Sequence, residues 1–232
     1  MKKTLLLCLL AASFTACQQN NNTQAAVAEQ ATKPSTPLQV VNDTIHLVQP
    51  DTTLTTTLMH TLSHRSSIRE YAQTQLDNET LSTLLWAANG INRPENGKRT
   101  APSAVNAQDI VLYVTMDMGT FVYLPKEHAL QLVCTTDLRK AVAHTQDFAA
   151  VAPLSIILVS DLTKFPFDDP QRATLLGAMD AGYVSQNIYL YCAADNLATV
   201  ARGTMDKAAI QQALQLTDKQ IPMLNHPVGY IK

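Results

Sequence analysis

The feature of this sequence that most restricts its fold is an apolar run at residues 154–160, which reads Leu-Ser-Ile-Ile-Leu-Val-Ser. The run is too short for most helices, and its almost continuous apolar composition is typical of a strand that is buried on both faces. Residues 170–194 form the longest helical pattern, and Asp168 or Asp169 before Pro170 provides a start signal for a helix. The folded part therefore contains a buried strand followed by a long helix.

The other patterns intermix helices with antiparallel strands. Helical spacing is found at residues 53–63, 78–89, 137–143 and 206–215. Strand patterns are found at residues 110–115, 120–124, 129–133 and 197–202, and an extended segment at residues 223–232. Residues 92–103 contain two prolines and one glycine, so we expect a loop there. Helices and strands do not alternate regularly, and the predicted fold class is α+β.

Local signals support the first two predicted helices. Leu54, Leu58 and Leu62 stand four residues apart, which indicates an amphipathic helix. Asp77 or Asn78 can cap the second helix by accepting a hydrogen bond from a backbone N–H of its first turn.

The N-terminus has the signals of an exported lipoprotein. Lys2 and Lys3 precede an apolar stretch at residues 5–12, which is too short for a permanent transmembrane helix of ~20 residues. The Phe-Thr-Ala-Cys run that follows resembles the lipobox of bacterial lipoproteins, in which the cysteine is lipidated. We predict a lipoprotein signal peptide at residues 1–17 with Cys17 as the lipid site; an ordinary cleaved secretory signal with an incidental cysteine is the alternative. The expected location is a membrane-anchored, exported lipoprotein that faces the periplasm.

A polar tract separates this signal from the folded part. Gln, Asn, Thr, Ala and Pro dominate residues 18–45, and such a composition cannot bury enough apolar surface to offset the entropy of ordering. We therefore predict a flexible tether at residues 18–45. Residues 50–232 remain, which is enough for one domain with a substantial core.

Composition and motifs disfavour several classes of function. The formal net charge is −2 and no basic stretch stands out, so nucleic acid is not an expected partner. The seven glycines form neither a G-x-G-x-x-G nor a Walker phosphate cradle. No G-x-S-x-G elbow surrounds Ser103 or Ser185, which disfavours a hydrolase.

Histidine and cysteine positions offer two further candidates. His60 and His64 could share a helix face as zinc ligands do, but residue 61 is Thr and no third ligand suggests itself. We therefore expect two surface histidines and no metal. Cys134 and Cys192 could form one disulfide, although their apolar neighbours favour two buried thiols.

Two segments have the composition of a cofactor site. In the first, Arg65 and Arg69 stand four residues apart with two serines between them, which suits a phosphate because guanidinium groups make strong charge-assisted hydrogen bonds. In the second, residues 98–108 offer Pro, Ser, Asn and Gln to a polar heterocycle. Taken singly, a solvated turn explains the first segment and a capped turn the second.

Together and in this order, the segments resemble the nitroreductase family of flavoproteins. The first family motif is matched by Arg65, Ser66, Ser67, Arg69 and Tyr71, and the second by Pro102, Ser103, Asn106 and Gln108. Between them lies a helix that ends in alanines and Gly90, and after them come Asp180, Gly182, Gln186 and Asn187 in the long helix and Gly203 behind a short strand. The resemblance spans residues 55–231. The Arg-Thr-Ala-Pro-Ser-Ala form of the second motif is most similar to the branch with the thiazoline/oxazoline dehydrogenases.

The resemblance implies a fold and a site. It implies a central, mostly antiparallel sheet flanked by helices, in a homodimer with FMN at its interface. Arg65 and Arg69 would bind the phosphate and ribityl end of FMN, with Ser66 and Ser67 adding hydroxyl or backbone contacts. Pro102, Ser103 and Asn106 of the other subunit would pack against the isoalloxazine ring. The backbone N–H of Gly203 would point at flavin N5.

The implied function is an FMN-dependent oxidoreductase. It would transfer hydride or electron pairs between a reduced donor such as NAD(P)H and a nitro, quinone or similar acceptor, without a catalytic side chain. A non-catalytic flavin- or ligand-binding lipoprotein that retains the fold is the alternative. The sequence departs from the family at Ala104, where many members have a second hydroxyl, and at Arg202, where one branch has an acid. A cationic Arg202 near the flavin would raise its potential, and Lys232 is the one candidate for the family's basic phosphate ligand near the C-terminus.

Overall fold

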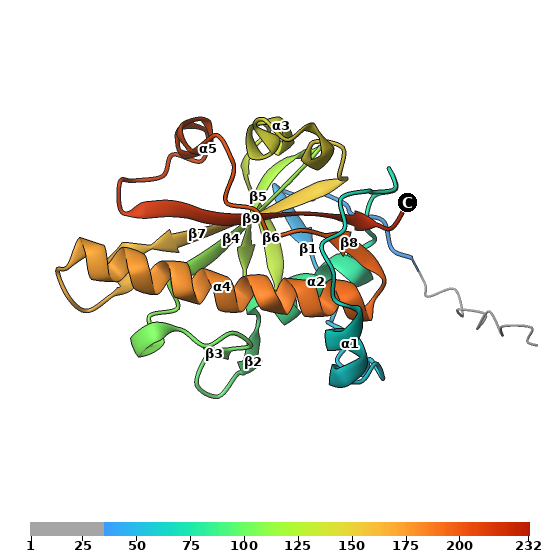
Figure 1. Ribbon diagram of the computed structural model, residues 1–232, viewed down its shortest axis with the longest axis horizontal. Coiled ribbons are helices and arrows are strands. Elements are labelled where there is room, and N and C mark those ends of the chain that lie inside the picture. The colour runs from blue at the N-terminus through green and yellow to red at the C-terminus, as the bar shows by residue number, and fades with distance from the viewer. Residues whose placement is uncertain (1–34) are drawn as a thin grey trace, which may run out of the picture. The chain divides into compact units, whose positions relative to one another are not determined.

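The computed structural model describes residues 35–232, which build one seven-stranded antiparallel sheet and the helices that cover it (Figure 1). The predicted signal peptide, Cys17 and most of the predicted tether lie outside the described residues. The strand order is β1-β6-β5-β4-β7-β9-β8. In chain order, the strands are β1 (Thr44–His46), β4 (Ile110–Met116), β5 (Gly119–Leu124), β6 (Ala129–Cys134), β7 (Leu154–Asp161), β8 (Leu197–Thr199) and β9 (Gln220–Tyr230).

Helices lie on both sides of this sheet, so the architecture has three layers (Figure 1). The helices are α1 (Leu58–His64), α2 (Asn78–Asn89), α3 (Arg139–Ala143), α4 (Pro170–Ala194) and α5 (Lys207–Ala213). Helices α2 and α4 cover one face, and α3 and α5 cover the other. The predicted α+β class with a central antiparallel sheet flanked by helices is confirmed.

Strand β7 lies between β4 and β9 and is buried on both faces, as its apolar run predicts. Ile156 and Leu158 belong to the core under α2 and α4. Ile157 and Val159 point the opposite way, because successive side chains of a strand alternate, and they pack in the core under α3 and α5. One strand therefore joins the two cores.

The two longest helices begin where their capping residues predict. The Asp77 side chain accepts a hydrogen bond from the Thr80 N–H at 2.7 Å and starts α2. The Asp169 side chain does the same for the Arg172 N–H at 3.0 Å, with Pro170 in the first turn of α4. Both caps satisfy backbone N–H groups that a helix leaves without partners.

Helix α1 differs from its prediction. It begins at Leu58 rather than residue 53, because the Thr57 side chain accepts the His60 N–H at 3.2 Å and caps it there. The leucines that predict a core-facing stripe are on the surface: Leu58 is 63% exposed and Leu62 45%. Only Thr61 of this helix is buried.

Two further segments differ from the sequence-based expectation. Thr44–His46 form β1, which pairs with β6, so the sheet begins inside the region predicted as tether and before the predicted domain start at residue 50. Residues 92–103 are not only loop, because β2 (Ile91–Arg93) and β3 (Lys98–Arg99) pair in a small hairpin. Gly97, with φ at 66°, occupies a left-handed position in its turn, which glycine adopts without strain.

The two cysteines of the described residues do not form a disulfide. Cys134 and Cys192 are free thiols, of which Cys192 is buried and Cys134 half-buried. Within residues 35–232, no helix combines the length and the apolar character that crossing a bilayer requires.

Candidate functional site

The first predicted cofactor segment follows the end of α1 and runs beside the edge strand β8. The Arg65 N–H donates to the Thr61 carbonyl at 2.9 Å and closes the helix. Three residues later, the Ile68 N–H donates to the Thr199 carbonyl at 2.9 Å. This backbone bond places the segment next to the strand that leads to Gly203.

Tyr189 on α4 connects the same two pieces of chain. Its hydroxyl lies 2.8 Å from the Ser67 Oγ and accepts the Ala201 N–H at 2.8 Å. The Arg65 guanidinium lies over the tyrosine ring, with its central carbon 5.0 Å from the ring centroid. Sequence reasoning missed Tyr189, because a tyrosine in a long helical pattern is typical of packing alone.

The guanidinium groups of Arg65 and Arg69 make few hydrogen bonds within the protein. Within residues 35–232, Arg65 uses its side chain in no hydrogen bond and Arg69 in one long one, to the Ser67 carbonyl at 3.4 Å. Neither arginine forms an ion pair with a carboxylate of this part of the chain. Both cations therefore keep forked donors available for an anionic ligand.

Arg202 differs from these arginines. It is buried, and its guanidinium donates to the carbonyls of Val142 and Ala143 and to the side chains of Gln146 and Asn225, at 2.8–3.0 Å. Burial lowers the pKa of Arg202 from its usual value. The first two acceptors are in the last turn of α3, so Arg202 ties that helix to β9. The Arg202 side chain therefore connects parts of the fold and is not exposed to solvent.

Gly203 follows with an open backbone. It is exposed, and a Cβ added to it would meet no atom within 4 Å. Among the described residues, no acceptor takes its N–H. The Gly203 N–H, the predicted hydrogen-bond donor to a cofactor, is therefore accessible. Gly203 follows four residues after Thr199, whose carbonyl accepts the Ile68 N–H.

The second predicted segment lies in a different place. Ser103 precedes a short 3-10 turn at Ala104–Asn106, in which Val105 and Asn106 adopt positive φ angles of 49° and 55°. The Ala104 N–H donates to both carboxylate oxygens of Asp180 on α4, at 2.9 and 3.0 Å. Pro102 and Asn106 are exposed. This loop is anchored to the protein and presents its outer side to solvent.

A buried acid pair supports this loop. Asp109 and Asp180 are almost fully buried, and the Ser160 hydroxyl donates to Asp109 at 2.5 Å. Burial raises the pKa of Asp109 well above that of an ordinary carboxyl, and the nearby Asp180 raises it further. The other oxygen of Asp109 has no partner while both groups are charged. A proton on Asp109 satisfies it, because a protonated carboxyl can donate to its neighbour.

The fold brings together only part of the predicted site. Arg65 and Ser67 contact Tyr189, which also binds Ala201, two residues before Gly203, whereas the loop that contains Ser103 is anchored at Asp180. These two anchors are nine residues apart on α4, which is ~14 Å along a helix. Within one chain, the segment with Arg65 and Arg69 and the loop with Ser103 are therefore anchored at different places on α4.

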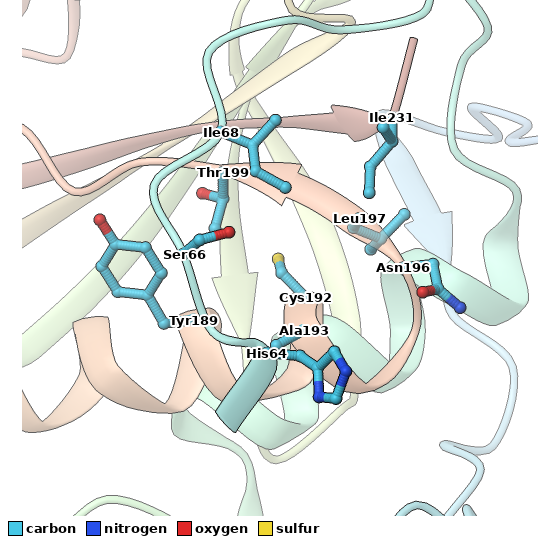
Figure 2. Close-up of a pocket in the computed structure, with 10 residues that line it drawn as sticks. All are labelled: His64, Ser66, Ile68, Tyr189, Cys192, Ala193, Asn196, Leu197, Thr199 and Ile231. Carbon is cyan, nitrogen blue, oxygen red and sulfur yellow. The ribbon is translucent and has the colours of Figure 1, made fainter. Parts of the chain in front are cut away.

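A cavity of about 180 Å³ lies beside the first segment (Figure 2). Ser66 lines it, with Tyr189 at one side and Asn196 at the other. Pockets for cofactor-sized ligands have ~300–1,000 Å³. This cavity of a single chain is thus too small to enclose a flavin.

The remaining candidates from the sequence lie apart from this arrangement. His60 and His64 are exposed and stack with ring centroids 3.9 Å apart. Among residues 35–232, no group of three or more His, Cys, Asp or Glu side chains is placed to hold a metal. Lys232 is exposed at the C-terminus.

Comparisons with known proteins cover the same residues. A family model described as the nitroreductase family matches residues 62–230. A nitroreductase-family protein of Methanocaldococcus jannaschii is 29% identical over 198 residues, which is 82% of this chain and 98% of that protein.

Solved structures agree. A nitroreductase-family protein of Ralstonia eutropha JMP134 superposes with a TM-score of 0.78 and 34% identity, covering 86% of this chain and 95% of its own. A chain of the Escherichia coli microcin synthetase McbBCD complex has a TM-score of 0.66 at 14% identity, covering 97% of this chain and 85% of its own, a likeness of fold alone. The family match includes both Arg65 and Gly203.

Proposed function

This chain belongs to the nitroreductase family of oxidoreductases, and we propose that it is an FMN-dependent member that acts as a homodimer. Bound FMN supplies hydride transfer at N5 between a reduced donor such as NAD(P)H and a nitro, quinone or similar acceptor. The observation that carries the proposal is the pair of guanidinium groups with unused donors, on a segment that hydrogen bonds of Ile68 and Tyr189 tie to the chain leading to Gly203.

The phosphate end of FMN would be held by Arg65 and Arg69. Both side chains keep their donors, and charge-assisted bonds from arginine to phosphate are strong and directional. Ser66 is exposed and Ser67 has one hydroxyl bond, to Tyr189, so both can add contacts. The Gly203 N–H would face the reactive edge of the ring.

A second copy of the chain would complete the site. Its loop residues Pro102, Ser103 and Asn106 would pack on the isoalloxazine ring. None of these loop residues lines the cavity beside Ser66 within one chain, and this supports a wall contributed by a second copy.

The surface of α4 also supports a dimer. Leu175, Met179 and Tyr183 stand four residues apart on one stripe and are 63%, 48% and 44% exposed. An apolar stripe of this kind is typical of a helix face that packs against another protein surface. Leu58 and Leu62 on α1 are also exposed.

The proposed cellular setting is that of an exported lipoprotein, anchored to a membrane by a lipid on Cys17 and facing the periplasm. Its electron donor would then be a reductant that reaches this compartment, with NAD(P)H as the donor to test first. No side-chain nucleophile or acid–base pair is needed for this chemistry, since the cofactor carries it.

The test uses the full chain, purified in detergent. We expect a yellow dimeric protein whose flavin absorbance is bleached by NADH or NADPH without oxygen. Bleaching by dithionite alone would favour the alternative, a flavin-binding protein without NAD(P)H turnover. A protein that stays colourless after incubation with excess FMN and desalting would overturn the assignment.

A further inference from the structure

Tyr189 touches both chain segments that would hold the two ends of FMN. Its hydroxyl accepts the Ala201 N–H and is bonded to the Ser67 Oγ, each at 2.8 Å. No other side chain of the described residues bonds to both segments. The backbone bond between Ile68 and Thr199 brings the two segments together, and the Tyr189 hydroxyl fixes where the Ser67 hydroxyl lies relative to the residues before Gly203.

The direction of the two bonds follows from proton counting. A tyrosine hydroxyl has one proton to donate and lone pairs to accept with. The Ala201 N–H occupies a lone pair, so every group is used if the Tyr189 O–H donates to the Ser67 Oγ. The Ser67 proton is then free to donate to a phosphate oxygen.

Two side chains contact the tyrosine ring. The Arg65 guanidinium lies over it, 5.0 Å from its centroid and within the range of a cation–π interaction. The buried His226 packs edge-on, with ring centroids 5.2 Å apart, and is itself hydrogen-bonded to Ser185 at 2.7 Å and Thr199 at 3.0 Å.

His226 adds no charge that competes with Arg65. Complete burial lowers the pKa of His226 to about 3, since its cationic form would lose its hydration. Because the imidazole in contact with the ring is neutral, Arg65 is the cation that contacts Tyr189.

We propose that Tyr189 is a positioning residue that holds the phosphate-binding segment and the Gly203 strand in one register, so that both ends of one FMN are bound together. The proposal rests on the FMN site proposed above. Without the hydroxyl, the phosphate contacts are lost first, because the ring end keeps Gly203 and the loop of the second copy.

The experiment compares FMN with riboflavin, which has the same ring but no phosphate. For Tyr189→Phe, which keeps the ring and the contact to Arg65, we expect FMN binding to weaken about tenfold, as for the loss of one well-used hydrogen bond. Riboflavin binding should stay almost unchanged, so the preference for FMN over riboflavin falls about tenfold. Fluorescence titration of the apo-protein measures both.

Tyr191→Phe is the matched control. Tyr191 is on the same helix and is buried, and its hydroxyl donates to Asp195 at 2.9 Å, away from the two cofactor segments. This variant also loses one hydroxyl bond, and we expect it to lower the melting temperature of the apo-protein while the preference for FMN stays at the wild-type value.

A second variant tests whether Tyr189 acts on phosphate binding through Ser67. Ser67 is exposed, so Ser67→Ala should fold normally and lose the same preference for FMN. In a double variant, Tyr189→Phe should cause no further loss, because the two residues act through one bond.

The outcomes separate the two proposals. If wild type binds FMN but Tyr189→Phe keeps the full preference for FMN, or weakens both flavins equally, Tyr189 is only a packing residue and this inference is overturned. If wild type binds neither flavin, the FMN site itself is absent and both proposals go.

Discussion

The two halves of the proposed site are built from opposite kinds of contact. In the phosphate half, Arg65–Arg69 and Gly203, neutral hydroxyls and backbone groups form the frame, and the guanidinium donors stay available. In the ring-facing loop, residues 102–106, the polar groups bind the protein itself. The Ser103 Oγ accepts the Gln108 N–H at 2.9 Å, and the Ala104 N–H binds the carboxylate of Asp180.

This difference indicates a division of roles. Donors that the protein leaves unused can gain free energy from a ligand, whereas donors that are already bonded can only hold a shape. We therefore expect the phosphate half to determine affinity, and the loop to determine the form of the wall that the second copy offers to the ring. Asp109 under the loop, whose pKa burial raises, also makes the stability of that half sensitive to pH above the range in which His226 titrates.

The largest expected effect is on affinity, and it tests the phosphate half. Replacing both Arg65 and Arg69 by alanine should weaken FMN binding ~100-fold or more, since each bond to a charged group contributes ~1.5–3 kcal/mol. Riboflavin, without a phosphate, should lose much less. Equilibrium dialysis of the apo-protein measures both ligands.

Arg172→Ala controls for the loss of positive charge. Arg172 is exposed at the start of α4, and its guanidinium contacts the Phe167 ring at 4.4 Å. We expect wild-type FMN affinity in this variant. A comparable loss in Arg172→Ala would mean that net charge, and not the two guanidinium forks, attracts the cofactor.

The sequence predicts best what is encoded locally. Both ends of α2 and α4 could be placed from Asp77, Asp169, Pro170 and the apolar spacing, because capping and helical periodicity act within a few residues. The buried strand β7 was predicted for the same reason. By contrast, Thr44–His46 join the sheet only because β6 offers an edge, and a polar tract does not reveal a distant partner.

The site was predictable in part. Arg65 and Arg69 stand out by their spacing and the two serines between them, whereas Gly203, more than a hundred residues later, is identified only through the resemblance to a family. Tyr189 carried no local signal that distinguishes it from a core tyrosine. The sequence does not reveal that Arg202 is buried, because its acceptors come from α3 and β9, which only the tertiary fold brings to it.

The second-largest expected effect is on stability, and it tests how closely α4 packs against Ser160 and Asp109 under the loop. A Cβ at Gly177 on α4 would lie within 3 Å of two Ser160 atoms, beside the carboxyl of Asp109. Gly177→Ala should therefore lower the free energy of unfolding by about 1–3 kcal/mol, as overpacking does. Urea denaturation of the apo-protein measures it.

Gly182→Ala is its matched control. Gly182 is on the same helix, but a Cβ there meets no atom within 4 Å. The variant should gain up to about 1 kcal/mol, because alanine favours a helix more than glycine. Equal changes in the free energy of unfolding for the two variants would show that α4 does not pack closely against Ser160 and Asp109 at Gly177.

The smallest effect concerns pH and would sharpen the comparison most. Burial raises the pKa of folded Asp109 above the ~3.9 of an unfolded aspartate. Between these two values the folded state binds more protons than the unfolded state, so the stability that this group contributes is present at low pH and is lost as pH rises through the folded pKa. His226 acts in the opposite direction but only below the pKa of ~6.5 of its unfolded form, because its folded pKa is lowered. From about pH 6.5 to pH 8, wild type should therefore lose on the order of 1 kcal/mol, since a tenfold change in an acid dissociation constant corresponds to about 1.4 kcal/mol.

Asp109→Asn isolates this contribution, because the amide can accept from Ser160 and donate to Asp180 without titrating. Its free energy of unfolding, from urea denaturation of the apo-protein at each pH, should stay flat over that range while that of wild type falls. The preference for FMN over riboflavin should not follow the same pH dependence in either protein, because hydroxyls and guanidinium groups, which do not titrate there, form the phosphate half. Parallel pH profiles of stability in wild type and variant would show that Asp109 does not hold this proton. The contrast between a titrating loop and a pH-independent phosphate half would then be wrong.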